Sequence, residues 1–155
     1  MPLQYAVETW AQYRPDAEPL WRDHWQEIAL DQDTIPLVCD HARYAELDAQ
    51  GHLHIVTARD DGRLVGYMLG VLLPGHLHYA TTPHYHMDVL YLQPGWRKGL
   101  AGYRLLQAVE RTVQARVGGL VKLVLGTKNH YDLGVLYTRL GYTEIERHFA
   151  KVLKG

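Results

Sequence analysis

A strand–turn–helix pattern over Met87–Arg111 is the feature that most restricts what this chain can fold into. Val89–Leu92 is apolar and typical of a strand, and Pro94 ends it. Apolar side chains then recur at three- and four-residue spacing, which predicts a helix from Leu100. They are Leu106, Val109, Val113 and Val117. A strand that leads directly into a helix indicates an α/β protein in which the helix packs against a sheet.

The turn between this strand and helix has the composition of a phosphate-binding loop. A helix N-terminus presents unpaired N–H groups and the positive end of the helix dipole, and both attract anions. Gly99 and Gly102 permit close approach of the backbone, and Arg97 and Lys98 add positive charge. The sequence therefore predicts a phosphate-bearing ligand at this turn.

The same turn resembles the acetyl-CoA pyrophosphate loop of the GNAT N-acetyltransferase superfamily, Arg/Gln-x-x-Gly-x-Gly/Ala, which lies between a strand and a helix. The match departs from that pattern at one position. If Gly99 and Ala101 take the small positions, Trp96 falls where Arg or Gln is expected. If Arg97 takes the first position, Leu100 falls on the first glycine. The Arg-x-Gly-x-Ala-Gly loop of a phage-associated branch of the superfamily is more similar.

This resemblance implies acetyl-CoA as the acetyl donor. The turn would hold its phosphates, and the backbone of the preceding strand would hold the pantetheine arm and polarise the acetyl carbonyl. An asparagine before a later helix would also bind the arm. The cofactor-binding residues implied are Leu90, Tyr91, Leu92, Arg97, Lys98, Gly99, Leu100, Ala101, Gly102, Tyr103 and Asn129.

Transfer of the acetyl group releases CoA as a thiolate, which needs a proton. A second motif contains a candidate donor of that proton. Leu136–Tyr142 resembles the Leu-Tyr-x-x-x-Gly-Phe/Tyr signature of GNAT enzymes, in which the tyrosine reaches the sulfur. The resemblance assigns Tyr137 as the general acid, because a phenol with a pKa near ~10 is still protonated at neutral pH. The alternative is a core tyrosine on a helix that packs against the sheet.

Asp88 is the first candidate for the catalytic base. It stands on the strand before the turn, where many GNAT enzymes have a glutamate, and its shorter side chain favours a relay through water. The alternative is a strand acid without catalytic duty. His84 or His86 is a second candidate, because imidazole titrates near neutral pH. Two His-x-His pairs, which also include His76 and His78, suggest zinc, but the cysteines that usually complete such a site are absent and we expect no metal.

The other hydrophobic patterns complete a single acetyltransferase domain over residues 1–155. We expect strands at 3–8, 52–59, 64–73, 87–92, 120–125, 142–145 and 149–153, and helices at 17–30, after Asp40, at 100–117 and at 133–140. Pro15 and Asp16 are start signals for the first helix, and the tight turn Asp60-Asp61-Gly62 predicts a hairpin of the strands at 52–59 and 64–73. The strands at 87–92 and 120–125 should be parallel, because a helical crossover joins them, and the last two strands should form a hairpin. An aromatic stripe that includes Trp21, His24 and Trp25 lies on one face of the first helix. We expect this stripe to pack against the sheet, with substrate contact as the alternative. The order resembles the GNAT α/β fold, with a mixed central sheet of about six to seven strands flanked by about four helices.

Composition limits the classes of partner that we expect for this protein. Sixteen basic and seventeen acidic residues leave a net charge of −1, which disfavours nucleic acid. Cys39 is the only cysteine, so an intramolecular disulfide is excluded. The N-terminal segment lacks a signal-peptide pattern, and the longest apolar run, 64–73, is about half the ~20 residues that a membrane span requires. We expect a cytoplasmic protein without a membrane partner, and a homodimer is compatible with this composition.

The expected function is N-acetylation of a primary amine on a small molecule or peptide, with acetyl-CoA as donor. The sequence does not identify the amine. One alternative is a non-catalytic acyl-CoA-binding regulatory module, which would keep the turn but need no acid at Tyr137. Another is a toxin-like acetyltransferase of charged tRNA, which would require a basic face that the near-zero net charge disfavours.

Overall fold

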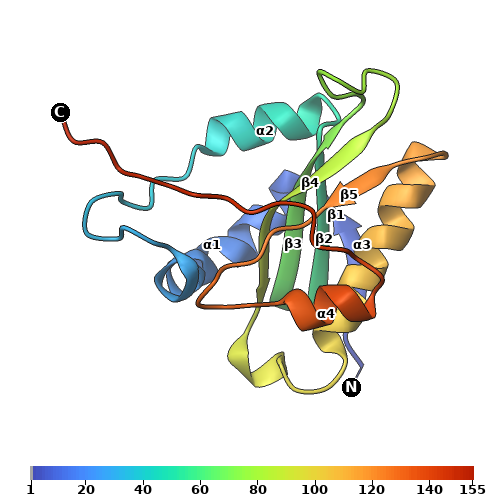
Figure 1. The fold of residues 1–155 in the computed structure, drawn as a ribbon. Helices are drawn as coiled ribbons and strands as arrows, with labels where there is room; N and C mark the ends of the chain where they lie inside the picture. The colour runs from blue at the N-terminus through green and yellow to red at the C-terminus, as the bar shows by residue number, and fades with distance from the viewer. Residues whose placement is uncertain (1) are drawn as a thin grey trace.

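A five-stranded sheet with helices on both faces forms the framework of the computed structural model, which describes residues 2–155 (Figure 1). The strands are β1 Gln4–Glu8, β2 Leu53–Asp60, β3 Arg63–Leu73, β4 His84–Leu92 and β5 Lys122–Val124. The helices are α1 Trp10–Ile28, α2 His41–Ala49, α3 Ala101–Val117 and α4 Gly134–Arg139, with a 3-10 turn, η1, at Pro94–Trp96. The strands lie in chain order, antiparallel except for the β4–β5 pair. This mixed α/β sheet confirms the expected fold class, and the parallel pair is the crossover predicted around the glycine turn.

The sheet separates two hydrophobic cores. On one face α3 and α4 cover Val65 and Tyr85, and on the other α1 and α2 cover Ile55 and Tyr67. Gly70 on β3 leaves the space that the Tyr85 ring fills, because a Cβ at this glycine would lie 2.1 Å from the ring Cζ. Each face of the sheet therefore has its own set of buried side chains, and β4 contributes to both.

Helix α1 begins earlier than the sequence indicated. The sequence predicts a start after Pro15, but the helix begins at Trp10 and contains Pro15 and Pro19. Thr9 is the N-cap. Its Oγ1 accepts the Gln12 N–H at 3.2 Å, and Gln12 Oε1 accepts the Thr9 N–H at 2.9 Å. This capping box determines the start of the helix, and each proline inside it removes only one backbone donor.

The predicted hairpin and second helix are confirmed. Asp61 and Gly62, with φ of 46° and 83°, form the tight turn between β2 and β3. Asp40 caps α2 by accepting the Arg43 N–H at 2.9 Å. β4 begins at His84 rather than at 87, and β5 covers only 122–124 of the expected 120–125.

The predicted C-terminal hairpin does not form, so the sheet has five strands rather than six to seven. From Tyr142 to Gly155 the chain has no regular secondary structure and leaves the body of the molecule (Figure 1). Ile145 and Phe149 are 61% and 94% exposed. An extended strand would place Arg147 on the same face as these two side chains, so neither face of the segment is continuously apolar.

Candidate active site

The open edge of β4 defines the candidate active site. β5 pairs with β4 only at His84–His86, opposite Lys122–Val124. Beyond this pairing β4 continues to Leu92, and β3 is its only strand partner among the residues that the structure describes. Main-chain N–H and C=O groups on such an edge are available to hydrogen-bond another extended chain. The three residues predicted to hold the pantetheine arm, Leu90, Tyr91 and Leu92, all lie on this open part of β4.

Asp88 lies at a β-bulge at the start of the open edge. The β3–β4 register shifts here, so that Met87 and Val89 face consecutive β3 residues and Asp88 faces none. A bulge redirects the side chain of its extra residue. The hydroxyl of Tyr44, from α2, donates a hydrogen bond to Asp88 Oδ2. Burial, followed by the nearby Asp88, raises the pKa of Tyr44, so the phenol stays a proton donor that orients the carboxylate.

The backbone of the predicted phosphate turn requires a glycine at one position. Gly99 adopts a φ of +84°, a left-handed conformation that other residues adopt only with strain. Leu100 is the N-cap of α3 and provides no side-chain cap, so the first-turn N–H groups have no capping partner within residues 2–155. The Tyr5 hydroxyl donates to the Ala101 carbonyl at 3.1 Å and fixes the start of α3 against β1. Lys98 is exposed beside these amides.

Gly102 and Tyr103 complete the predicted turn in the first turn of α3. A Cβ at Gly102 would point toward α4, where it would meet Leu136 Cδ2 at an ordinary 3.7 Å. Gly102 has no positive φ. Of the two turn glycines, only Gly99 is required by backbone conformation.

Arg97 has a different environment from the one its charge suggested. Its NH1 and NH2 groups donate to the two carboxylate oxygens of Glu27 at 2.8 and 2.6 Å, and Nε donates to the Leu92 carbonyl at 2.7 Å. Its guanidinium carbon also lies 5.7 Å from the ring centre of Tyr91 and 5.3 Å from that of Tyr131. Arg97 therefore ties the turn to α1, and Lys98 is the turn cation that remains available to a phosphate.

Tyr137 lies against the same strand from the α4 side. Its hydroxyl donates to the Gly126 carbonyl at 2.7 Å and lies 3.7 Å from Met87 Sδ, beside Asp88 on β4. The side chain is 6% exposed, and burial raises the pKa of the phenol. The group is therefore protonated at neutral pH, but in this state its proton is engaged by a backbone carbonyl.

Asn129 lies in the exposed turn after β5, between the bridged residues Lys128 and Tyr131. Because Tyr131 packs on Arg97, this turn lies beside the phosphate loop. The predicted pantetheine ligand is thus near the open β4 edge.

The histidines gather at the other end of β4. The ring centres of His76, His84 and His86 lie 5.4 to 6.3 Å apart. Burial, with smaller contributions from neighbouring positive charge, lowers the pKa of His86. Within residues 2–155 no group of three His, Cys, Asp or Glu side chains is arranged to hold a metal ion. Of the candidate bases, Asp88 lies at the bulge where the open edge of β4 starts, whereas His84 and His86 lie in the part of β4 that pairs with β5.

A cavity that the sequence did not reveal lies on the α1 and α2 face. It has a volume of about 150 Å³ and borders Tyr44 and Val89, the neighbours of Asp88. Its other walls come mainly from the aromatic stripe of α1 and from β3, and the residues include Trp21, His24, Trp25, Ile28, Leu37, Cys39, Tyr67 and Leu69. These side chains come from segments far apart in the sequence, so no local motif marks them.

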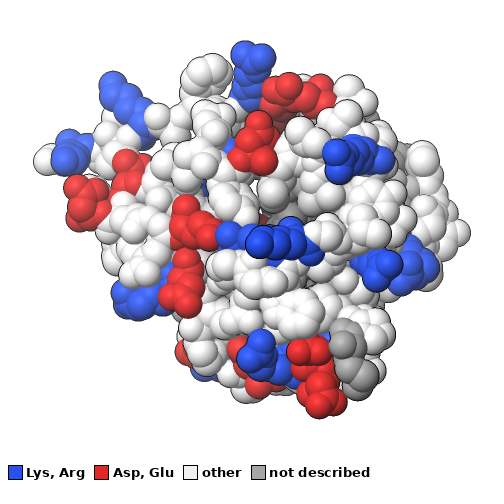
Figure 2. Space-filling model, turned by 90° about the horizontal axis from the view of Figure 1, so that it is seen from below, with Lys and Arg blue, Asp and Glu red and all other residues white. Residues whose placement is uncertain are grey.

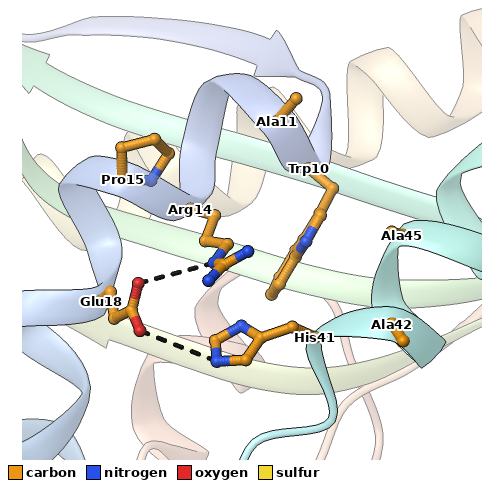
Figure 3. A pocket seen from close by; sticks show the side chains of 8 residues that line it. All are labelled: Trp10, Ala11, Arg14, Pro15, Glu18, His41, Ala42 and Ala45. Carbon is orange, nitrogen blue, oxygen red and sulfur yellow. Dashed lines mark ion pairs between the residues drawn. The ribbon is translucent and has the colours of Figure 1, made fainter.

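A larger hollow of about 570 Å³ lies between α1 and α2 (Figure 3). Glu18 bridges Arg14 at 3.5 Å and His41 at 3.7 Å across it. None of the predicted site residues lines this hollow, so we place the active site at the smaller cavity and the open β4 edge.

Surface charge agrees with a small ligand. Basic and acidic side chains are interspersed on the face shown in Figure 2, without the continuous basic surface that nucleic acid requires. No helix within residues 2–155 is long and apolar enough to cross a membrane.

The bulge carboxylate, the open strand edge and the glycine turn follow one another along the chain and form one continuous candidate site. The family model described as the Acetyltransferase (GNAT) family matches residues 8–142, and the chain belongs to this family. It is an acetyltransferase by family, and acetyl-CoA is the family's acetyl donor. No curated protein sequence matches the chain.

Solved structures share the fold over nearly the whole chain. An aminoglycoside acetyltransferase from an uncultured soil metagenomic sample, in complex with sisomicin, is 15% identical with a TM-score of 0.73, covering 98% of this chain and 97% of that one. A predicted acetyltransferase with acetyl-CoA from Clostridium acetobutylicum is 13% identical, TM-score 0.67, covering 97% and 96%. A ribosomal-protein-alanine N-acetyltransferase from Brucella melitensis biovar Abortus 2308 is 17% identical, TM-score 0.64, covering 99% of each chain. At these identities the likeness shows the fold.

Proposed function

We propose that this protein transfers the acetyl group of acetyl-CoA to a primary amine of a small molecule or peptide. The main observation in support is the position of Asp88, a bulge carboxylate at the start of an unpaired strand edge that ends at the phosphate turn. Structures of the same fold act on both kinds of acceptor, an aminoglycoside and a ribosomal protein. The amine and the thioester would meet beside this carboxylate.

The donor would bind along two features of the chain. The uncapped amides at the start of α3 and the Lys98 ammonium would hold the phosphates. The main-chain groups that Leu90 and Leu92 direct to the open edge, other than the Leu92 carbonyl that Arg97 occupies, would hold the pantetheine arm as an added strand. A backbone N–H on this edge, directed at the acetyl oxygen, would stabilise the negative charge that develops there.

The acceptor amine must be neutral to attack. Asp88 would accept its proton through a water molecule, while Tyr44 holds the carboxylate in place. The amine nitrogen then forms a bond to the acetyl carbon, the carbon–sulfur bond breaks, and the thiolate of CoA leaves. Tyr137 would donate a proton to that sulfur after its hydroxyl turns away from the Gly126 carbonyl.

A second function is a non-catalytic acyl-CoA-binding module. The observation that favours it is the same hydrogen bond, because a phenol proton already engaged by the Gly126 carbonyl is not free for sulfur. Such a module would use the turn and the β4 edge without turnover.

Free-thiol release from acetyl-CoA, measured over a panel of amines and peptides, separates the two functions. We expect release with at least one amine, and a loss of about 100-fold or more in Asp88→Asn, as for a positioned base. The matched control is Asp33→Asn, which changes an exposed carboxylate in the loop after α1 and should leave the rate unchanged. Tight binding of acetyl-CoA without thiol release from any amine would contradict the enzymatic function.

A further inference from the structure

The cavity beside Asp88 has walls suited to an apolar group. Besides His24 and the phenols of Tyr13, Tyr44 and Tyr67, its lining consists of apolar and indole-bearing side chains, and no Lys, Arg, Asp or Glu contributes to it. Burying an unpaired charge or hydroxyl in such a lining is unfavourable, whereas burying a hydrocarbon group is favourable. The composition of the walls therefore restricts which acceptors can enter.

The size of the cavity sets the size of the group. About 150 Å³ is the volume at which an apolar protein cavity accommodates a benzene ring. A branched aliphatic side chain such as isobutyl also fits this volume. A several-ring polyhydroxylated amine would have to leave most of its atoms outside.

The cavity is connected to the proposed base at one wall. Tyr44 lines the cavity and donates its hydroxyl proton to Asp88, and Val89 lines it directly after Asp88 in β4. An amine placed at the carboxylate would therefore have its substituent beside this wall of the cavity. Such an arrangement suits arylalkylamines and the first residue of a peptide.

The surface beside the cavity is also apolar. The loop between α1 and α2 exposes apolar side chains there, with Ile35 52%, Leu37 42% and Val38 81% exposed. These side chains offer apolar surface that an occupant could cover.

We propose that the cavity selects the acceptor, so that the preferred substrate is a primary amine with one phenyl-sized or branched aliphatic group close to the nitrogen. This inference rests on the proposed function, because it assigns a substrate class to the same site. The shared chemistry occurs both in small arylalkylamines and in peptides that begin with phenylalanine or leucine.

The test compares two pairs of acceptors that differ in the apolar group, 2-phenylethylamine with ethylamine and Phe-Gly with Gly-Gly, and adds kanamycin as a polyhydroxylated amine. Thiol release is measured with 2-phenylethylamine, ethylamine and kanamycin, and with the dipeptides Phe-Gly and Gly-Gly. We expect the apolar member of each pair to exceed its partner by about 10- to 100-fold in kcat/KM, as burial of such a group supplies. Preference for 2-phenylethylamine identifies a small-amine source, and preference for Phe-Gly a peptide source. Equal kcat/KM for 2-phenylethylamine, ethylamine and kanamycin would overturn the inference while leaving the proposed function intact.

A cavity-filling variant provides the second test. Ile28→Trp places a larger side chain in the cavity, and we expect the preference for the apolar acceptor to fall at least tenfold. Leu120→Trp is the control, because this residue is 79% exposed in the segment between α3 and β5 and should keep the preference. If Ile28→Trp does not fold, quenching of tryptophan fluorescence by 2-phenylethylamine in the wild type replaces it, since Trp21 and Trp25 line the cavity. An unchanged preference in a folded Ile28→Trp, or no quenching by 2-phenylethylamine at concentrations that support turnover, would overturn the inference.

Discussion

The two halves of the site are built in different ways. The half that would hold the cofactor comes from one continuous stretch, in which β4, η1 and the start of α3 follow one another. The half that would hold the acceptor joins distant segments: Tyr44 meets Asp88 across 44 residues, and the cavity walls come from α1, α2, β3 and β4. The difference shows why cofactor sites are recognised in a sequence more easily than acceptor sites. A local motif records the first, whereas only the folded chain assembles the second.

The largest expected effect tests the chemical step, which takes place where the two halves meet. Tyr137→Phe keeps the ring but removes the proton donor, so single-turnover acetyl transfer should slow by roughly 10²–10⁴-fold with CoA affinity little changed. Loss of the hydrogen bond to Gly126 should lower the free energy of unfolding by only about 1 kcal/mol. A rate within about threefold of wild type, well short of what a positioned acid contributes, would assign Tyr137 to the core and favour the binding module.

Acid sensitivity should involve both faces of the sheet, because each face packs against one buried neutral histidine. Burial lowers the pKa of His24, on the α1 face, and of His54, which contacts Thr112 of α3, from 6.5 to about 4. The unfolded chain binds these protons more readily, so each histidine contributes stability that is complete above pH ~6.5 and is lost as the pH falls toward 4, about 2 kcal/mol each by pH 5. Thermal melts from pH 7.5 to 4.5 should show this decline.

The variant His24→Phe sharpens that comparison, because it removes one of the two titrating groups. Its melting temperature should fall less steeply between pH 6.5 and 4.5 than that of the wild type. A slope identical to wild type would show that His24 does not stay neutral in the folded protein.

A smaller effect tests the contact that joins the halves. Because Arg97 is bound to Glu27 and Leu92, both Arg97→Ala and Glu27→Gln should displace the turn and weaken CoA binding about tenfold, or ~1.4 kcal/mol. Lys98→Ala should also weaken CoA binding. The loss of affinity should be largest at low salt and shrink as salt is added, and the melting temperature should not change. Calorimetric titration with CoA measures the affinity of all three variants. Tighter binding in Glu27→Gln would instead mean that Arg97 contacts the phosphates directly.

The smallest effect separates the two turn glycines. Gly99→Ala should lower the free energy of unfolding by about 1 kcal/mol, because its φ of +84° is strained for alanine. Gly102→Ala should raise it by about 0.5 kcal/mol, since an alanine is favourable in a helix and its Cβ has room. Denaturant titration distinguishes them, and equal destabilisation by both would contradict the assigned backbone roles.

The sequence predicted the elements whose signals are local. Periodicity located α3, the Asp61-Gly62 turn located the β2–β3 hairpin, and Asp40 located the start of α2. The prediction was wrong for the start of α1, because a proline is common at the start of a helix and Pro15 lies inside this one. The C-terminal segment alternates too weakly to form strands. For the site, motifs indicated Tyr137 and the turn, but the bulge at Asp88 depends on strand register and the cavity on side chains from several elements, neither of which a single sequence reveals.

Amide hydrogen exchange with and without acetyl-CoA tests most directly whether the open β4 edge and the turn after it form the cofactor site. We expect saturating acetyl-CoA to slow exchange at the Leu90 and Leu92 amides, which face the open edge, and at amides of residues 98–103 at the uncapped start of α3. The strands paired on both sides, β2 and β3, should change little. Binding of acetyl-CoA that leaves both segments exchanging at their free rates, with protection elsewhere, would contradict it.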